Sequence, residues 1–226
     1  MKLSIIIPTL NEGAIIRPSL TAISGLRSAG HEIIVADGGS SDNTVLAAKP
    51  LADKVITAKT GRARQMNAGA RAACGDVLVF LHADTLLPSN ASDLIIFGLK
   101  KSGKSWGRFD VHLSGGYLIL RIVEIMMNWR SRLSGIATGD QCLFIDRDLF
   151  DAVGGFPDLA LMEDIALSRL LKQREHPLCI REKVITSSRR WERQGFMRTI
   201  LQMWRLRLGF LLGEDPRRLA QVYQQK

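Results

Sequence analysis

A histidine and an aspartate stand at the end of one apolar segment, and both can bind a metal ion. His82 and Asp84 directly follow the apolar run 76–81. Alternate residues of an extended chain share a face, so an imidazole and a carboxylate at this spacing can reach one divalent ion. A diphosphate then supplies further oxygen ligands to such an ion. The alternative is that His82 packs against a neighbour and Asp84 caps the following turn.

An acidic pair, Glu163 and Asp164, follows an apolar turn and opens a predicted helix. A helix N-terminus favours carboxylates through its free N–H groups and its dipole, so a structural role is the ordinary explanation. The functional alternative is that one carboxylate removes a proton from an acceptor hydroxyl. A carboxylate close to the surface is ionised at neutral pH without special tuning, as that role requires.

Polar residues also follow the two predicted strands 2–7 and 32–36. Asp37 can accept hydrogen bonds from a ribose or from a base N–H, whereas capping of the next helix explains Ser40 and Asp42 equally well. Ligands of an open α/β sheet bind outside the carboxyl ends of its strands. We therefore expect these residues to meet the histidine and aspartate described above in one crevice.

Arginines stand at the start of the predicted helix 62–74, and arginine is well suited to phosphate contacts. Arg62, Arg64, Gln65 and Asn67 form this polar group, whose alternative role is that of a solvated helix face. The segment 189–191, Arg-Arg-Trp, could close over a phosphate or a sugar, or be a surface basic cluster anchored by its tryptophan. The chain has no G-x-G-x-x-G and no G-x-x-x-x-G-K-[ST], so the dinucleotide and P-loop fingerprints are absent.

The elements that must position these residues alternate between strands and helices, which predicts a parallel α/β sheet. The run Lys2 to Ile7 is β-branched and apolar throughout, as in a strand that is buried on both faces. No internal repeat and no clean boundary divides the chain. The predicted strands are 2–7, 32–36, 54–58, 76–81, 106–113, 142–146 and 184–187, and the predicted helices are 14–29, 43–49, 62–74, 89–101, 117–132, 161–173 and 196–212.

The composition is that of an ordinary globular domain. The chain has 226 residues, of which 46% are hydrophobic and 23% are charged. These values exclude collagen-like, coiled-coil and wholly disordered proteins. Three cysteines without C-x-x-C spacing argue against a disulfide framework or a zinc ribbon, and favour a reducing cytoplasm. No run of 18 apolar residues is free of charge, so we expect no membrane-spanning helix.

The net charge of +9 is concentrated near the end of the chain. Residues 181–226 hold eleven basic and four acidic residues, a balance of +7, whereas residues 1–180 carry +2. Nucleic acid, an anionic membrane surface and a phosphorylated substrate all suit such a basic tail.

Taken in order, these segments resemble the family 2 glycosyltransferases of the GT-A fold, and the resemblance covers residues 2 to 192. The stretches Leu-His-Ala-Asp-Thr (81–85) and Gly-Asp-Gln (139–141) in a short chain are similar to a compact bacterial subgroup of that family. The segments that carry the family resemblance are Ser4 to Glu12, Val35 to Asp42, Gly61 to Gly69, Gly75 to Asp84, and Gly154 to Phe156 followed by Glu163 and Asp164.

The resemblance implies one GT-A domain over residues 1–226, with a Rossmann-like and mostly parallel central sheet flanked by helices. It assigns residues 1–101 to the nucleotide-sugar donor half and residues 102–192 to the acceptor half. Residues 193–226 are then a basic, amphipathic helical tail.

The resemblance also implies a nucleotide-diphospho-sugar donor, with UDP the favoured nucleotide, and a divalent metal ion, Mn²⁺ or Mg²⁺. The sugar then moves to an acceptor hydroxyl by direct displacement, with inversion at the anomeric carbon. The implied roles are nucleotide-sugar binding for Pro8, Thr9, Asn11, Glu12, Asp37, Gly38, Asp42, Arg62, Arg64 and Asn67; metal binding for Asp84 and His82; the base for Asp164 with Glu163 beside it; and acceptor or closing-loop contacts for Asp140, Arg190 and Trp191.

Two departures from the family pattern affect this interpretation. His82 replaces the first aspartate of the usual Asp-x-Asp motif, and imidazole is a softer ligand that tilts the preference toward Mn²⁺. It is also open whether Asp84 alone coordinates the ion. Ser187 replaces the glutamine of the Q-x-x-R-W motif of processive synthases, so we expect a single transfer.

Two other functions compete with this one. A nucleotidyltransferase usually needs a Gly-rich loop with a lysine after the first strand, and Pro-Thr-Leu-Asn-Glu (8–12) has neither. The basic tail could instead bind nucleic acid, but its apolar residues make that unlikely and suit a membrane surface or a partner better. We therefore expect a cytoplasmic enzyme that contacts the inner face of the membrane peripherally, with core packing of one helix face as the alternative.

Overall fold

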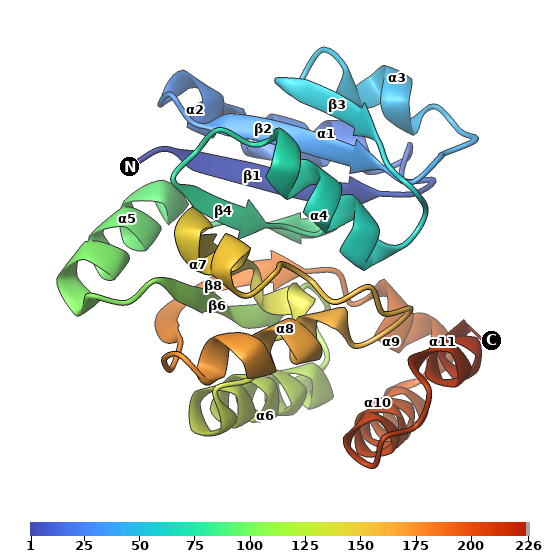
Figure 1. Ribbon diagram of the computed structural model, residues 1–226. Helices are drawn as coiled ribbons and strands as arrows, with labels where there is room; N and C mark the ends of the chain where they lie inside the picture. Colours follow the sequence, from blue (N-terminus) through green and yellow to red (C-terminus); the bar gives the residue numbers. More distant parts are fainter. Residues whose placement is uncertain (225–226) are drawn as a thin grey trace.

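An eight-stranded sheet runs through residues 1–224, the part of the chain that this computed structural model describes (Figure 1). Its strand order is β3-β2-β1-β4-β7-β6-β8-β5. Four neighbouring pairs are parallel and three are antiparallel, which confirms a mostly parallel sheet. The strands are β1 (Leu3–Thr9), β2 (Glu32–Asp37), β3 (Lys54–Thr57), β4 (Val77–Phe80), β5 (Thr85–Leu86), β6 (Trp106–Leu113), β7 (Leu143–Asp146) and β8 (Leu178–Thr186).

Helices cover the sheet, and the C-terminal helices lie together at one end of the view in Figure 1. Among residues 1–224, no helix is both long and apolar enough to cross a bilayer. The helices are α1 (Ile16–Ala22), α2 (Ser24–Ser28), α3 (Thr44–Ala48), α4 (Arg62–Ala72), α5 (Ala91–Ser102), α6 (Leu118–Ser134), α7 (Arg147–Ala152), α8 (Glu163–Lys172), α9 (Arg189–Gln194), α10 (Phe196–Leu211) and α11 (Pro216–Gln224), with a 3₁₀ turn η1 at Gly139–Gln141.

The first strand is apolar without interruption because both of its faces are covered. Ile5 and Ile7 belong to the larger core cluster, whereas Ile6 points to the opposite face and packs in a second cluster with Met66 of α4. Gly69 lets α4 lie close to this strand, because a Cβ at that position would collide with the side chain of Ile6. The loops after β1 and β2 are thereby held beside the start of α4.

Several element predictions were wrong in their bounds. The predicted helix 14–29 is two helices, because Ile23 leaves the helical conformation and the hydroxyl of Ser24 donates to the carbonyl of Thr21. The last strand begins at Leu178 rather than at 184, since the charged run Arg181 to Lys183 hides its pattern. Elements β5, α7, α9 and α11 were not predicted, being short or strongly polar.

A buried glutamate joins the start of β2 to the turn before β4. The carboxylate of Glu32 accepts hydrogen bonds from the hydroxyl of Ser4 and from the backbone N–H groups of Cys74 and Gly75. The ammonium of Lys54 lies 3.4 Å from its second oxygen. Burial opposes ionisation, but these hydrogen bonds and the lysine charge lower the pKa of Glu32 to about 2.

We expect Glu32→Gln to remove much of the acid sensitivity of this fold. A lowered native pKa means that the carboxylate stabilises the native state above its ordinary pKa near 4.5, and that this contribution disappears as the pH falls toward about 2. The variant should lose about 3 kcal/mol of unfolding free energy at pH 7 and little near pH 2. Urea unfolding of the wild type and the variant between about pH 2 and pH 7 measures this difference in unfolding free energy. The assignment would be contradicted if the two free energies changed with pH in the same way.

Candidate active site

Asp37, the last residue of β2, holds the loop that follows that strand. Its side chain is buried and accepts hydrogen bonds from the backbone N–H groups of Gly39 (2.9 Å) and Ser40 (2.8 Å) and from the Ser40 hydroxyl. The hydroxyl of Thr9, at the end of β1, donates to the same carboxylate at 3.2 Å. Burial opposes ionisation, but these donors lower the pKa of Asp37. The carboxylate therefore joins the two loops in which nucleotide binding is predicted.

Further hydrogen bonds join the loop after β1 to the loop after β2. The N–H of Asn11 donates to the hydroxyl of Ser40 at 2.8 Å, and the amide oxygen of Asn11 accepts from the N–H of Ser41 at 2.9 Å. Asn11 has a left-handed backbone conformation, with φ of 56°, which asparagine tolerates better than most residues. The N–H of Glu12 donates to the hydroxyl of Thr44 at 2.8 Å. The two loops thus form one bonded surface at the carboxyl edge of the sheet.

Helix capping was one of two explanations left open for Ser40 and Asp42, and the two side chains differ in what they contact. One oxygen of the Asp42 carboxylate accepts the N–H of Thr44 at 2.9 Å, and the other accepts the N–H of Gly13 at 2.9 Å. The hydroxyl of Ser40 donates to Asp37 instead and does not cap the helix. Asp42 serves both the helix start and the loop after β1.

Gln65 of α4, which belongs to the polar group predicted at the start of this helix, bonds the ends of both strands, a role that we did not predict. Its side-chain amide nitrogen donates to the carbonyls of Thr9 (2.7 Å) and Ala36 (3.0 Å), one on each strand end. Gly38 lies so close that a Cβ would be 2.9 Å from this side chain. Pro8 lies in β1 beside Ala36, next to these contacts. The sequence signal for this role is a polar residue at a position on the buried face of a predicted helix.

His82 and Asp84 follow β4, where they meet η1 and the loop after β1. Nδ1 of His82 lies 3.3 Å from a carboxylate oxygen of Asp140, and the imidazole lies against Gly139 so closely that a Cβ there would collide with it. Burial raises the pKa of Glu12, and the negative charge of Asp84 raises it further. Glu12 and Asp84, predicted for different roles, therefore interact through their charges.

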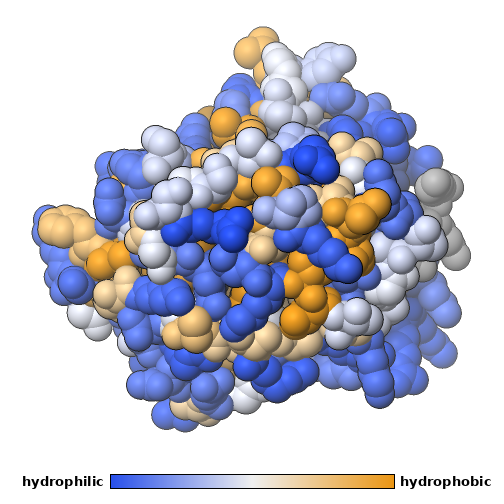
Figure 2. Space-filling model, turned by 90° about the horizontal axis from the view of Figure 1, so that it is seen from above, coloured by the Kyte–Doolittle hydropathy of each residue, from blue (hydrophilic) through white to orange (hydrophobic). Residues whose placement is uncertain are grey.

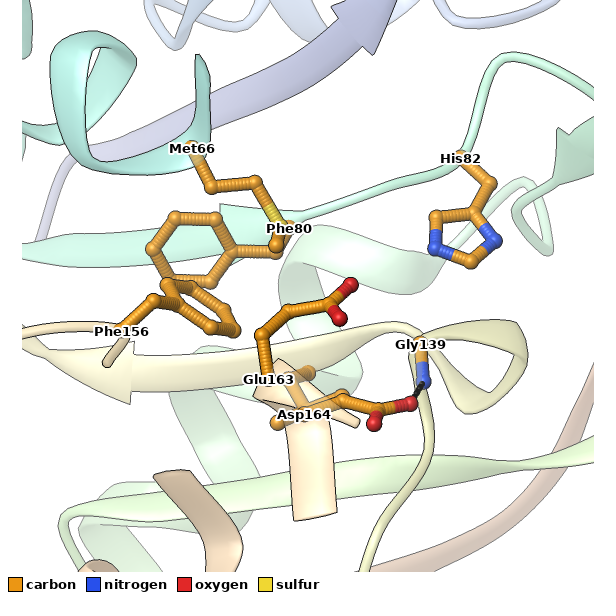
Figure 3. A pocket seen from close by; sticks show the side chains of 8 residues that line it. Met66, Phe80, His82, Gly139, Phe156, Glu163 and Asp164 are labelled. Carbon is orange, nitrogen blue, oxygen red and sulfur yellow. Dashed lines mark hydrogen bonds between the residues drawn. The ribbon is translucent and has the colours of Figure 1, made fainter. Parts of the chain in front are cut away.

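Glu163 and Asp164 open α8 and line a small cavity with His82 and Gly139, as Figure 3 shows. Asp164 accepts the N–H of Gly139 at 2.8 Å. Glu163 is only 3% exposed, and one of its oxygens lies 3.5 Å from Nε of Arg62. Burial raises the pKa of Glu163 against the opposing charge of Arg62. The two neighbouring carboxylates therefore differ, since Glu163 is enclosed and Asp164 is more accessible.

Arginines from three helices surround this acidic group. Desolvation opposes ionisation of Asp140, but the hydrogen bond from His82 and the charges of Arg62 and Arg190 lower its pKa. Arg130 of α6 was not predicted; its Nη2 is buried and has no hydrogen-bond partner among the residues described. Burial lowers the pKa of Arg130, whereas the charges of Asp164 and Asp140 raise it, which places this guanidinium near the same carboxylates.

Two of the predicted donor residues are engaged elsewhere. Arg64 pairs with Asp158 at 2.8 Å and lines a separate hollow, outside the cavity in Figure 3. Asn67 lines the same hollow, and both ends of its side-chain amide bond the backbone of Phe156, at 2.8 and 2.9 Å. Asn67 thus holds the turn at Phe156 against α4.

The predicted closing segment is also held in place. The guanidinium of Arg190 stacks over the ring of Tyr223 at 3.5 Å and donates to the carbonyl of the same residue at 3.0 Å. Trp191 packs against the larger core cluster instead of facing the acidic group. Helix α9 is thereby fixed between the core and α11.

A model of the family described as Glycosyl transferase family 2 matches residues 4–133, more than half of the chain. This protein belongs to that family. "Probable glycosyltransferase YdaM" of Bacillus subtilis (strain 168) is 31% identical over an alignment of 191 residues, and the match covers 74% of this chain and 46% of that protein. The chain thus spans about half the length of that relative.

Solved structures of similar fold agree with the predicted architecture. The match to a TarS fragment of S. aureus (residues 1–349) has a TM-score of 0.69 at 17% identity and covers 83% of this chain and 61% of that fragment. The mannosyltransferase PcManGT from Pyrobaculum calidifontis has a TM-score of 0.65 at 21% identity, with 92% and 61% covered. At such identities the likeness shows the fold alone, and that fold is GT-A, as the resemblance implied.

Proposed function

We propose that this protein transfers a sugar from a nucleotide-diphospho-sugar, with UDP as the favoured nucleotide, to an acceptor hydroxyl in a single inverting step. The observation that best supports the proposal is the convergence of elements from both halves of the chain. Asp164 and His82 line one cavity, and Asp84 is near enough to Glu12 to raise its pKa. The proposed metal ligands and the proposed base thus come from different segments of the chain. This arrangement suits an enzyme that holds a donor and an acceptor side by side.

The donor class rests on the fold and on what related structures contain. TarS of S. aureus has been solved with UDP-GlcNAc and with UDP, and the Pyrobaculum calidifontis mannosyltransferase with GDP-Man and Mn²⁺. In this chain the bonded loops after β1 and β2 offer a surface for a nucleoside, and the buried Thr9 and Asp37 hold these loops together beneath it. We therefore propose these loops as the nucleotide site.

The residues after β4 fit a divalent metal ion that is shared with a substrate. No group of three or more His, Cys, Asp or Glu side chains in residues 1–224 is arranged to hold an ion alone. Mg²⁺ and similar ions usually take one or two carboxylates from the protein and complete their shell with phosphate oxygens. Asp84, with His82 beside it, would supply such a partial set. The bound ion would neutralise the charge of the diphosphate.

The proposed step uses Asp164 as the base. Its carboxylate takes the proton of the acceptor hydroxyl while the hydroxyl oxygen bonds to the anomeric carbon. The bond from that carbon to the diphosphate oxygen breaks on the opposite face, and the nucleoside diphosphate leaves with the electron pair. The N–H of Gly139 holds one carboxylate oxygen at 2.8 Å and so fixes the direction in which the base points.

A thermal-shift panel of UDP and GDP, with and without Mn²⁺ or Mg²⁺, tests the donor class. One nucleoside diphosphate should raise Tm by about 5–10 °C at roughly 100 times its Kd, and should need the metal to do so. Product analysis with the matching sugar nucleotide then distinguishes the reaction. Release of nucleoside diphosphate supports transfer, whereas release of pyrophosphate, or no response to any nucleotide, contradicts it.

A further inference from the structure

Helix α6 exposes its apolar side chains. The structure describes this helix in full, and every residue that it exposes is apolar, with exposed fractions from 51% to 83%. Three- and four-residue spacing places these side chains on one face of the helix. The exposed residues are Leu118, Ile122, Ile125, Met126, Trp129 and Leu133.

The opposite face of α6 is buried and mixed: Leu120, Val123 and Met127 pack in the larger core cluster, and polar side chains between them bond β6. Strand β7 pairs with β6 only over Trp106 to Arg108, so backbone groups farther along β6 need other partners. Asn128 bonds both the N–H and the carbonyl of Val111, at 2.9 and 3.1 Å, and Glu124 accepts the N–H of Leu113 at 2.6 Å. Turning the apolar face inward would break these bonds, so its exposure is built into the fold.

Helix α10 carries a second apolar stripe. Leu206 and Phe196 pack inward on α10, while five apolar residues on its other face are 57–65% exposed. The ring of Phe196 contacts that of Tyr117, just before α6, with centroids 5.0 Å apart, so the two helices start side by side. The exposed apolar residues of α10 are Met197, Leu201, Trp204, Leu208 and Leu211.

The exposed faces of α6 and α10 carry charge of one sign. Within these two fully described helices, the exposed charged residues are Arg198 and Arg205, and no acidic side chain is exposed. Both arginines lie on α10, among its apolar stripe. Figure 2 shows the molecule from above, where hydrophilic residues lie among the hydrophobic ones over the whole face.

This pattern favours a lipid surface over a second copy of the chain. A two-fold contact through the same stripes would bring arginines toward arginines, with no exposed carboxylate on either stripe to pair with them. An anionic bilayer supplies the opposite charge, and tryptophan with leucine beside arginine is the composition of helices that lie in the membrane interface.

We propose that α6 and α10 together form a membrane-docking surface that binds anionic bilayers peripherally. The apolar stripes enter the boundary between headgroups and acyl chains, while Arg198 and Arg205 contact lipid phosphates. The sequence indicated such a contact for the tail alone, and α6 doubles the surface. The proposal concerns binding to lipid and does not depend on the sugar-transfer reaction.

Sedimentation with vesicles tests the apolar part of the surface. The protein should bind vesicles of equal parts phosphatidylglycerol and phosphatidylcholine. Trp129→Ser/Leu133→Ser on α6 and Trp204→Ser/Leu208→Ser on α10 should each weaken binding about ten-fold or more. The control Leu46→Ser/Phe97→Ser removes equally exposed apolar residues elsewhere and should leave binding unchanged. Because all these side chains are exposed, we expect Tm to stay near that of the wild type in every variant.

A second pair of variants tests the contribution of the two exposed arginines to vesicle binding. Each arginine near an anionic leaflet strengthens binding about five-fold, so Arg198→Ala/Arg205→Ala should weaken it about 30-fold on the anionic vesicles. It should have little effect on vesicles of phosphatidylcholine alone. The control Arg17→Ala/Arg71→Ala removes two exposed arginines of the donor half and should retain binding.

Two results would overturn the docking surface. One is the absence of vesicle binding at low salt while the nucleotide-dependent thermal shift is normal, which would leave the proposed transfer reaction intact. The other is a dimer in light scattering that the stripe variants convert to monomers, since a second copy would then cover these helices. Vesicle binding without any nucleotide response would instead overturn the proposed reaction alone.

Discussion

Asp164→Asn should lower kcat by about 10²- to 10⁴-fold, the usual contribution of a positioned general base. Asparagine has nearly the same shape and can still accept the N–H of Gly139, which lies 2.8 Å from the carboxylate in the wild type. It cannot take a proton from the acceptor. Donor affinity should therefore stay near the wild-type value while turnover falls, because the loss concerns the chemical step.

Glu163→Gln is the matched control for this experiment. Glu163 is buried against Arg62, so we expect its substitution to reduce turnover much less. Burial raises its pKa, so its charge costs the native state stability above that pKa, and the glutamine variant should be no less stable at pH 7. Near-normal turnover of Asp164→Asn together with inactive Glu163→Gln would transfer the role of base to Glu163.

Asp84→Ala should reduce the affinity for UDP with Mn²⁺ by about 100-fold or more, because it removes the carboxylate that we propose as the protein's metal ligand. Affinity for UDP without metal should change little, since the loops after β1 and β2 remain intact. Calorimetry with and without Mn²⁺ separates the two. Asp93→Ala, an exposed carboxylate on α5, is the control. Unchanged affinity for UDP with Mn²⁺ in Asp84→Ala would contradict the assignment.

The same measurement on His82→Ala decides what the histidine does. Nδ1 of His82 is 3.3 Å from Asp140, so the imidazole is positioned to hold that carboxylate. A loss of metal-dependent affinity like that of Asp84→Ala would make His82 a metal ligand. Retained affinity with reduced turnover would make it a positioning residue for Asp140.

Much of the fold of residues 1–101 could be predicted from the sequence. Strands β1, β2 and β4 are covered on both faces, which demands uninterrupted apolar runs, and such runs are visible without a structure. The fold of the later residues was harder to predict. Strand β8 contains the charged run Arg181 to Lys183, and α9 and α11 are polar helices whose partners are distant in sequence. Local pattern carries no information about such partners.

The candidate site divides in the same way. His82, Asp84 and Asp164 were predicted because chemically suited side chains stand directly at element ends. Arg130 was missed and the role of Gln65 was not predicted, because each lies within a helix and acquires its partners only when that helix packs. Asn67 and Arg64 show the converse, since residues typical of donor contacts are engaged by Phe156 and Asp158.

Helix α6 separates what the sequence determines from what only the tertiary structure decides. The spacing of its residues establishes an amphipathic helix, because apolar and polar side chains recur every three or four positions. It does not establish which face is buried, since burial depends on what the neighbouring element needs. Beyond Trp106 to Arg108, β6 lacks β7 as a partner and takes Asn128 and Glu124 instead. Bonding those buried backbone groups turns inward the face that carries Asn128 and Glu124, together with the core residues Leu120, Val123 and Met127, and leaves the second apolar face exposed.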